Sequence, residues 1–496
     1  MIRPDDLAKF LASVRDTIAS ELRPDLKSDN NRAKADSVLL VLDRLITDMN
    51  HGGDIAAARL GTWEDLRGEL RTLGLDAGAS SGVRAAGYPG AVNYLQAEIG
   101  DLQNLFDSEA GFASLKGKLA SGDGAMHDWF SRAVNALVDL TVATEIVLPE
   151  EKAQAGGAVA PDETDRLHKA LSAYLKKRYP ELPDDPVAEF RLSPGGYAKQ
   201  TGLFKLKPNS ILPTRLVMRL DMAVSITTTS VKDEYPVIHR AFDMGLPVPR
   251  PVLLEEDKAA LGGRFMLMTE VEDSAPSGPY FPEERKPGQL KLGPEFGKEV
   301  ARTLAKLHSG SRTSASSAVP DYQKVVADSH AAWQKIEKSP FSVGTEMGYA
   351  WLLSHPLGSD RPWCTVHGDF GAHNILVRDG HLSGLIDWEL AHPGDPAEDI
   401  AQCRMMLLPG IMEWKDFVRE YIAAGGDPKA CDEQSVGYFC VWIYLFHLSL
   451  NAVLRQKFLA GERTDILAAN VVSHYHSLLI EYLVRALKIA VDASKA

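Results

Sequence analysis

Apolar residues recur three or four positions apart through the first part of the chain, which is the spacing of one face of an α-helix. The stretches with this pattern lie at residues 7–18, 38–46, 95–106 and 129–147. A Gly-, Ala- and Ser-rich loop at 77–90 separates the first two from the last two. Neither a strand-like alternation nor a group of catalytic residues accompanies them. The pattern therefore predicts an all-helical N-terminal domain over residues 1–150, of unknown role.

The pattern changes after a short segment of small residues at 151–161, which has no periodicity and is predicted to be a linker. A helix with an acidic start and a basic end is predicted next, ending near Pro180. Alternating apolar and polar positions then predict strands, and helical spacing resumes near Val231. The predicted strands lie at 187–192, 202–207 and 215–220, with a later one at 265–269. Mainly helical patterns fill the remainder, so this part belongs to the α+β class.

Composition is that of an ordinary globular protein, with 45% apolar and 24% charged residues among 496. The formal net charge of −13 and the lack of a dense Lys/Arg stripe argue against nucleic-acid binding. The four cysteines have no metal-binding spacing and are expected to be reduced. The N-terminus lacks the apolar segment of a signal peptide. We therefore expect a cytoplasmic protein.

One apolar stretch, at residues 436–454, is long enough to consider as a membrane span. It contains His447, Ser449 and Asn451 and is followed by Arg455. A spanning helix needs about 20 nearly unbroken apolar residues. The stretch is therefore predicted to be a buried helix, and no membrane association is expected.

The strongest chemical signal is the segment HGDFGAHNILV at residues 367–377, followed by LIDWE at 385–389. Its spacing places Asp369 and Asn374 at the two ends of one short loop. A strand leads out of the loop, turns at Gly380, and a returning strand brings Asp387 beside Asn374. Phosphoryl transfer needs a carboxylate to accept the proton of the attacking hydroxyl and oxygen ligands for magnesium. One hairpin therefore offers a base and two metal ligands.

An alternative interpretation makes these residues hydrogen-bonded turn residues near the end of a core. An isolated HGD motif would be compatible with either interpretation. The additional Asn374 and the LIDWE segment at this distance favour the catalytic one.

The two segments resemble those of the aminoglycoside phosphotransferase and choline kinase family, whose members are related to protein kinases. The resemblance extends from about residue 162 to 487. It implies a bilobal kinase-like fold with a β-rich N-lobe at 162–271 and a helical C-lobe at 272–496. It also implies ATP and Mg²⁺ as cofactors, Asp369 as catalytic base, and Asn374 and Asp387 as magnesium ligands.

The same resemblance implies nucleotide-binding positions upstream. Gly195 and Gly196 join two predicted strands, where flexible glycines let backbone amides approach phosphate. On their own, two glycines between strands more often form only a hairpin turn. The surrounding residues depart from the family pattern, so Lys199 is a further candidate for the phosphate contact. Arg219 lies where protein kinases have their nucleotide-binding lysine, with Glu234 on the next helix as its expected partner. The alternative for Arg219 alone is a surface charge on a strand.

Two further assignments come from the resemblance. Met268 is expected to line the adenine pocket, and backbone groups of Thr269 and Val271 to meet the adenine edge, although a methionine is equally suited to a core. The segment around Asp395 and Asp399 is expected to begin a helix that braces the catalytic loop. A structural role for these two aspartates, as helix caps, is favoured.

The histidines in the family motifs are expected to have mainly structural roles. His308 closes a helix, and His367 is expected to orient the catalytic loop. His373 precedes a metal ligand and faces either the substrate or the interior.

The acceptor is poorly determined by sequence. It depends on the helices after Asp399 and on the insertion between Glu272 and Glu295. The C-terminal helices are aromatic and apolar, and they look like those of family members associated with acyl-CoA catabolism; a purely structural role for these aromatics is equally compatible. A metabolic or xenobiotic hydroxyl compound such as a hydroxyacyl derivative is therefore favoured over a polycationic antibiotic.

Two alternatives remain. One is an antibiotic phosphotransferase for aminoglycosides or macrolides. The other, from a different class, is a nucleotide-binding pseudokinase or scaffold; the intact Asp369, Asn374 and Asp387 argue against it. The N-terminal helices are compatible with covering the cleft, with homo-oligomerisation or with partner binding.

Overall fold

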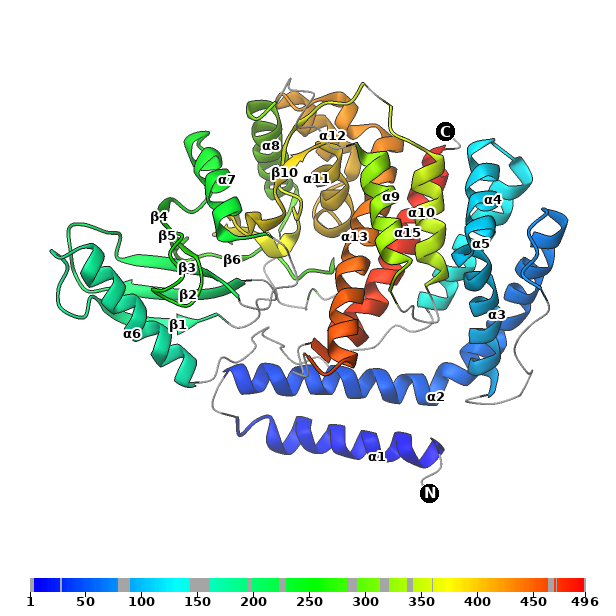
Figure 1. The fold of residues 1–496 in the computed structure, drawn as a ribbon, viewed down its shortest axis with the longest axis horizontal. Helices are drawn as coiled ribbons and strands as arrows, with labels where there is room; N and C mark the ends of the chain where they lie inside the picture. The colour runs from blue at the N-terminus through cyan, green and yellow to red at the C-terminus, as the bar shows by residue number, and fades with distance from the viewer. Residues whose placement is uncertain are drawn as a thin grey trace.

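The chain folds into a β-rich lobe, a large helical lobe and an N-terminal set of helices (Figure 1). The computed structural model describes residues 4–26, 29–78, 90–142, 161–193, 199–222, 229–282, 285, 292–312, 321–336, 342–358, 360–462, 468–469 and 471–494. Parts of the predicted 77–90 loop and most of the predicted linker lie outside this set, as do residues 143–147 of the last predicted N-terminal helix.

The β-rich lobe contains a five-stranded antiparallel sheet with the strand order β1-β2-β3-β5-β4. Its strands are β1 (Val187–Leu192), β2 (Lys199–Leu206), β3 (Arg215–Asp221), β4 (Pro251–Glu255) and β5 (Phe265–Thr269). Helix α6 (Pro161–Arg178) packs on β1, and α7 (Val231–Asp243) contacts β3, β4 and β5. Strand β4 was not predicted, because PVLLE shows no alternation and its pairing with β5 is a long-range contact.

The first turn of α7 is fixed by its own sequence. Ser230 and Asp233 form a capping box: the Ser230 hydroxyl accepts a hydrogen bond from the Lys232 N–H, and the Asp233 carboxylate accepts one from the Ser230 N–H. Asp221 at the end of β3 accepts hydrogen bonds from the Ser230 hydroxyl and the Val231 N–H, at 2.5 and 2.9 Å. The helix is thereby held against β3, so that Glu234 faces the strand that carries Arg219.

The helical lobe follows. Its helices are α8 (Pro294–Gly310), α9 (Tyr322–Trp333), α10 (Val343–Ser354), α11 (Ala397–Gln402), α12 (Trp414–Ala423), α13 (Glu433–Leu459) and α15 (His476–Ser494). Shorter turns are η3 (Ala372–Asn374), η4 (Trp388–Leu390), η5 (Cys403–Leu407), η6 (Pro428–Cys431) and η7 (Val471–Tyr475).

Two small antiparallel sheets in this lobe hold the motif residues. β7 (Cys364–Val366) pairs with β10 (His392–Gly394), and β8 (Ile375–Arg378) lies between β9 (His381–Leu385) and the short β6 (Ala275–Pro276). Ile375 is opposite Leu385 in the β8–β9 ladder. The hairpin predicted from the sequence is therefore present. Its return strand was predicted at residues 382–386 and lies one residue earlier, at His381–Leu385.

The N-terminal helices pack on the helical lobe. They are α1 (Pro4–Thr17), η1 (Ile18–Leu22), α2 (Asp29–Thr72), α3 (Gly90–Asp107), α4 (Glu109–Ala120) and α5 (Gly124–Val142); α4 was not predicted. α5 contacts α15, and both α3 and α4 contact α10. The Phe130 and Trp351 rings stack with centroids 5.3 Å apart. The buried side chains of these helices and of the helical lobe form one continuous cluster, whereas most of the five-stranded sheet has its own.

This shared core predicts a large effect for Phe130→Ala. The Phe130 side chain is fully buried on α5, and truncating a buried phenylalanine costs about 3–5 kcal/mol of unfolding free energy. We expect urea unfolding to shift by this amount, with the helical lobe unfolding in the same transition. Phe242→Ala on α7, where the side chain is 38% exposed, is the matched control with a much smaller loss. Separate transitions for the two regions in the wild-type protein would contradict the shared core.

Among the described residues, one helix is long and apolar enough to cross a membrane. It is α13, and 78% of its most apolar window is buried inside the protein. Its composition is accounted for by packing against α11 and α15. This placement agrees with the predicted buried helix at 436–454.

Candidate active site

Helix α11 supports the loop that carries Asp369. The Asp399 carboxylate accepts hydrogen bonds from the His367 and Gly368 N–H groups, at 2.8 and 2.9 Å. His308 at the end of α8 contacts the same carboxylate through Nε2 at 3.1 Å. Gly368 has φ +77°, and a Cβ there would lie 2.4 Å from the Leu390 carbonyl oxygen. The loop therefore has one backbone path, which only glycine permits at this position.

Asp399→Asn is expected to loosen this loop. Asp399 is fully buried, and an amide presents an N–H₂ group to donors that need an acceptor, which costs about 1–3 kcal/mol per unsatisfied group. We expect lower stability and a reduced kcat with the KM for ATP nearly unchanged, since the nucleotide contacts lie elsewhere. Urea unfolding and steady-state kinetics measure the two effects. A kcat equal to that of the wild type would rule out the bracing role.

Three side-chain donors surround the Asp369 carboxylate. Gln402 Nε2 donates to Oδ1 at 2.9 Å, and Asn374 Nδ2 and His373 Nε2 lie 2.8 and 3.1 Å from Oδ2. Burial alone favours the protonated acid, but the His373 ring and its hydrogen bond outweigh it, so the pKa of Asp369 lies well below its usual range. The carboxylate is therefore ionised at neutral pH and can accept a hydrogen bond from a substrate hydroxyl.

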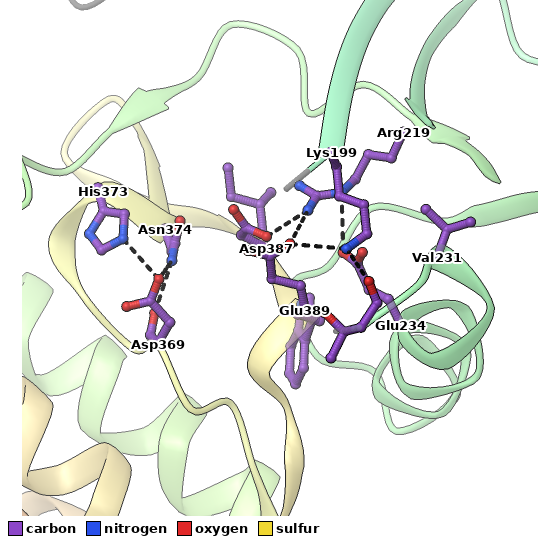
Figure 2. A network of polar contacts seen from close by, with 12 residues as sticks. Lys199, Arg219, Val231, Glu234, Asp369, His373, Asn374, Asp387 and Glu389 are labelled. Atoms are coloured by element: carbon purple, nitrogen blue, oxygen red, sulfur yellow. Dashed lines mark hydrogen bonds and ion pairs between the residues drawn. The ribbon is translucent and has the colours of Figure 1, made fainter. Parts of the chain in front are cut away.

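Asn374 and Asp387 offer oxygen ligands on one hairpin (Figure 2). Asn374 uses its Nδ2 for Asp369, which leaves its Oδ1 as the ligand atom. The Ile386 N–H donates to the Asn374 carbonyl at 3.0 Å, which holds the two ligand residues together. Asp387 has φ +63° and its carboxylate is 33% exposed. An amide oxygen and a carboxylate are the donors that Mg²⁺ prefers, and further ligands come from phosphates. The residues fit magnesium.

Arg219 lies at the centre of a charged group between the lobes (Figure 2). Its Nη2 contacts Asp387 Oδ1 at 2.7 Å, and its Nε lies 3.3 Å from Glu234 Oε1. The expected Arg219–Glu234 pair is therefore present. Burial opposes the charge on Arg219, but Asp387 and then Glu234 outweigh it and raise its pKa. Burial raises the pKa of Glu234, and Arg219 counteracts this only partly.

A second cation joins this group. Lys199 is buried at the start of β2, and its Nζ lies 3.2 Å from Glu389 Oε2 and 2.8 Å from the Thr229 carbonyl oxygen. Glu389 also lies 3.6 Å from Arg219 Nη2. Lys199 and Arg219 thus lie on the same side of Asp387, the residue predicted to bind magnesium. Two buried cations here suit the phosphates of a nucleotide.

The predicted adenine residues lie on and just after β5. Met268 is buried opposite Val217. The Thr269 N–H is occupied by the Arg250 carbonyl, at 3.0 Å. No hydrogen bond to the Val271 N–H is found among the described residues. None of these contacts tests the adenine assignment, which stays a prediction. Gly195 and Gly196 lie outside the described residues.

The other motif residues make contacts that hold the catalytic loop and the start of α11 in place. His367 Nε2 lies 3.0 Å from the Ile386 carbonyl oxygen, which links the catalytic loop to the segment before Asp387. Asp395 accepts the Ala397 N–H at the start of α11 and pairs with Arg361. Asp395 is thus a helix-start residue, whereas Asp399 braces the loop rather than capping α11.

Several site residues were missed from the sequence. Gln402 accepts the Phe370 N–H at 2.5 Å while donating to Asp369. Glu389 was seen only as part of the LIDWE segment. Tyr280 and His447 lie beside His373, and their hydroxyl and ring nitrogen are hydrogen-bonded. The position of Gln402 one turn after Asp399 is the one sequence signal that pointed toward the loop.

Part of the chain is similar to known proteins. Residues 209–433 match the model of the family described as "Phosphotransferase enzyme family". The chain is 25% identical over 282 residues to acyl-CoA dehydrogenase family member 11 of Mus musculus, covering 53% of this chain and 32% of the mouse protein. It therefore spans about a third of the length of this curated relative. It is 31% identical over 175 residues to viomycin phosphotransferase of Streptomyces vinaceus, covering 30% of this chain and 55% of that protein.

Solved structures that align with part of this chain include a choline kinase of Streptococcus pneumoniae. It has a TM-score of 0.44 and 14% identity, and the alignment covers 64% of this chain and 98% of that one. A type I macrolide 2'-phosphotransferase has a TM-score of 0.40 and 18% identity, with 63% and 96% covered.

Proposed function

We propose that this chain, whose residues 209–433 form a domain of the phosphotransferase enzyme family, transfers the γ-phosphoryl group of ATP to a hydroxyl of a small molecule. The observation that carries the proposal is the Asp369 carboxylate, 2.8 Å from Asn374 Nδ2, on the loop that leads into the hairpin before Asp387. Arg219 and Lys199 beside Asp387 supply the positive charge that a nucleotide needs.

Each site residue has a distinct role in the proposed transfer. Asp369 orients the acceptor hydroxyl for in-line attack and takes its proton late, because the transition state is loose. Arg219 moves its Nη2 contact from Asp387 to the α/β-phosphates, while Glu234 keeps its guanidinium in place. Asn374 Oδ1 and Asp387 would hold Mg²⁺, which neutralises charge on the phosphate oxygens. Asp399 and Gln402 keep the base in position.

The acceptor is proposed to be a metabolic or xenobiotic hydroxyl compound, such as a hydroxyacyl derivative. Aromatic side chains next to His373 support this choice: the Tyr280 ring centroid lies 4.8 Å from that of His373, and the Tyr475 centroid lies 6.4 Å from that of Tyr280. The similarity to acyl-CoA dehydrogenase family member 11 is compatible with it. The similarity to viomycin phosphotransferase supports the second candidate, an antibiotic phosphotransferase, equally well. A cytoplasmic location is part of the proposal and is supported by four buried free cysteines.

A phosphorylation screen tests this function. The full chain is incubated with MgATP and pools of hydroxylated metabolites and antibiotics, including choline, viomycin and 3-hydroxybutyryl thioesters, beside the Asp369→Asn variant. Mass spectrometry follows a gain of about 80 Da, the mass of the HPO₃ that phosphoryl transfer adds. A product made by the wild type alone supports the proposal and identifies the acceptor class. ATP binding without any product would favour the pseudokinase alternative.

A further inference from the structure

Asp369 and His373 lie on the other side of Asp387 from Arg219 (Figure 2). From there, contacts lead through His373 to Tyr280 and His447. His373 Nε2 lies 3.1 Å from Asp369 Oδ2, and the His373 and Tyr280 ring centroids are 4.8 Å apart. The Tyr280 hydroxyl is hydrogen-bonded to His447 Nδ1. The three residues come from the catalytic loop, the 272–295 insertion and α13, so only the fold brings them together.

Tyr280 is held in place by anchors on both sides of it. Upstream, Ser277 donates its N–H to the Ile375 carbonyl at 2.7 Å and its hydroxyl to the Ala372 carbonyl at 2.8 Å. Downstream, Arg285 Nη2 donates to the Leu407 carbonyl at 2.9 Å. The insertion is therefore tied to the catalytic loop and to η5. A side chain fixed in this way is pre-organised for binding.

The Tyr280–His447 pair retains hydrogen-bonding capacity beyond its own bond. Burial lowers the pKa of His447, so the imidazole is neutral at neutral pH. When Tyr280 donates to Nδ1, His447 Nε2–H is the remaining donor and the tyrosine oxygen the remaining acceptor. When Nδ1–H donates instead, the tyrosine O–H is the remaining donor and Nε2 the remaining acceptor. In both arrangements the pair offers one donor and one acceptor, which is what a hydroxyl group requires.

The surroundings of the pair are aromatic. The Tyr475 ring centroid lies 6.4 Å from that of Tyr280 and 5.7 Å from that of Phe281. The Asp369 carboxylate acts electrostatically on both residues, but among the described residues no carboxylate forms a hydrogen bond or ion pair with Tyr280 or His447. The pair itself carries no negative charge to hold an ammonium group, and its neutral donor and acceptor fit an uncharged oxygen group.

We propose that Tyr280 and His447 together bind a second, uncharged oxygen group of the acceptor, a hydroxyl or carbonyl next to the hydroxyl presented to Asp369. This inference rests on the proposed phosphotransfer. Both residues act by positioning the acceptor and take no part in proton transfer. They select compounds with two neighbouring oxygens over simple alcohols.

The test compares Tyr280→Phe, His447→Gln and the double variant with the wild type, using the acceptor with the highest kcat/KM in the screen. Each single variant is expected to raise the acceptor KM about tenfold, the effect of one lost hydrogen bond. The KM for ATP and the slow hydrolysis of ATP by water should not change. Because the pair acts as one unit, the double variant should add little to either single change.

Tyr482→Phe is the matched control, since it removes the same atom from the same aromatic cluster, beyond Phe281. Thermal melting of every variant excludes unfolding as the cause. An unchanged acceptor KM, or a fall in kcat alone, would overturn the positioning role and leave the phosphotransfer intact. Absence of transfer to every pool would instead contradict the proposed function, and the inference would fall with it.

Discussion

Asp369→Asn should lower kcat by about 10²–10⁴-fold, the usual contribution of a general base, while ATP binding is largely retained. The amide keeps the size of the side chain but accepts no proton at neutral pH. Because Arg219, Lys199 and Asp387 lie on other segments, the nucleotide contacts persist. Steady-state kinetics gives kcat, and titration calorimetry with MgATP gives the nucleotide Kd.

The Asn side chain also turns one acceptor oxygen into a donor that faces Gln402, Asn374 or His373. A stability loss of about 1–3 kcal/mol is expected from this alone, so melting curves must accompany the kinetics. Asp379→Asn is the control, because Asp379 is an exposed residue in the turn of the same hairpin. Near-normal turnover by Asp369→Asn would remove Asp369 as the base.

Asp387→Asn should weaken magnesium-dependent nucleotide binding and turnover together. Loss of an outer-shell partner already costs about 10–100-fold in metal affinity, and a direct ligand should cost at least as much. Asparagine is the preferred replacement because the backbone at residue 387 has φ +63°, which asparagine adopts more readily than alanine. The Kd for ATP, measured at several Mg²⁺ concentrations, shows the effect.

Raising the Mg²⁺ concentration separates the two variants. Added metal should restore part of the activity of Asp387→Asn and none of that of Asp369→Asn, since only the first lacks a ligand. Asp379→Asn again serves as control: its position also has a positive φ, +53°, and no hydrogen bond or ion pair joins it to the site residues within the described part of the chain. Equal magnesium dependence in Asp387→Asn and the wild type would contradict the ligand role.

Sequence alone determined the parts of the site that are close along the chain. Asp369, Asn374 and Asp387 fall on one loop and one hairpin, whose strands follow from local apolar patterns and a turn at Gly380. The Arg219–Glu234 pair also follows from neighbouring elements, a strand and the next helix. Strands β1, β3 and β5 and the start of α7 were predicted for the same reason. Local periodicity fixes which face a residue occupies within its own element.

Tertiary structure alone decided which distant residues meet. Arg219 and Asp387 are 168 positions apart, Lys199 and Glu389 are 190 apart, and Tyr280 and His447 are 167 apart. The fold also brings buried side chains of α2, α3, α4 and α5 and of the helical lobe into one continuous cluster. Periodicity carries no information about partners across lobes, because these depend on sheet register and on the closure of long loops.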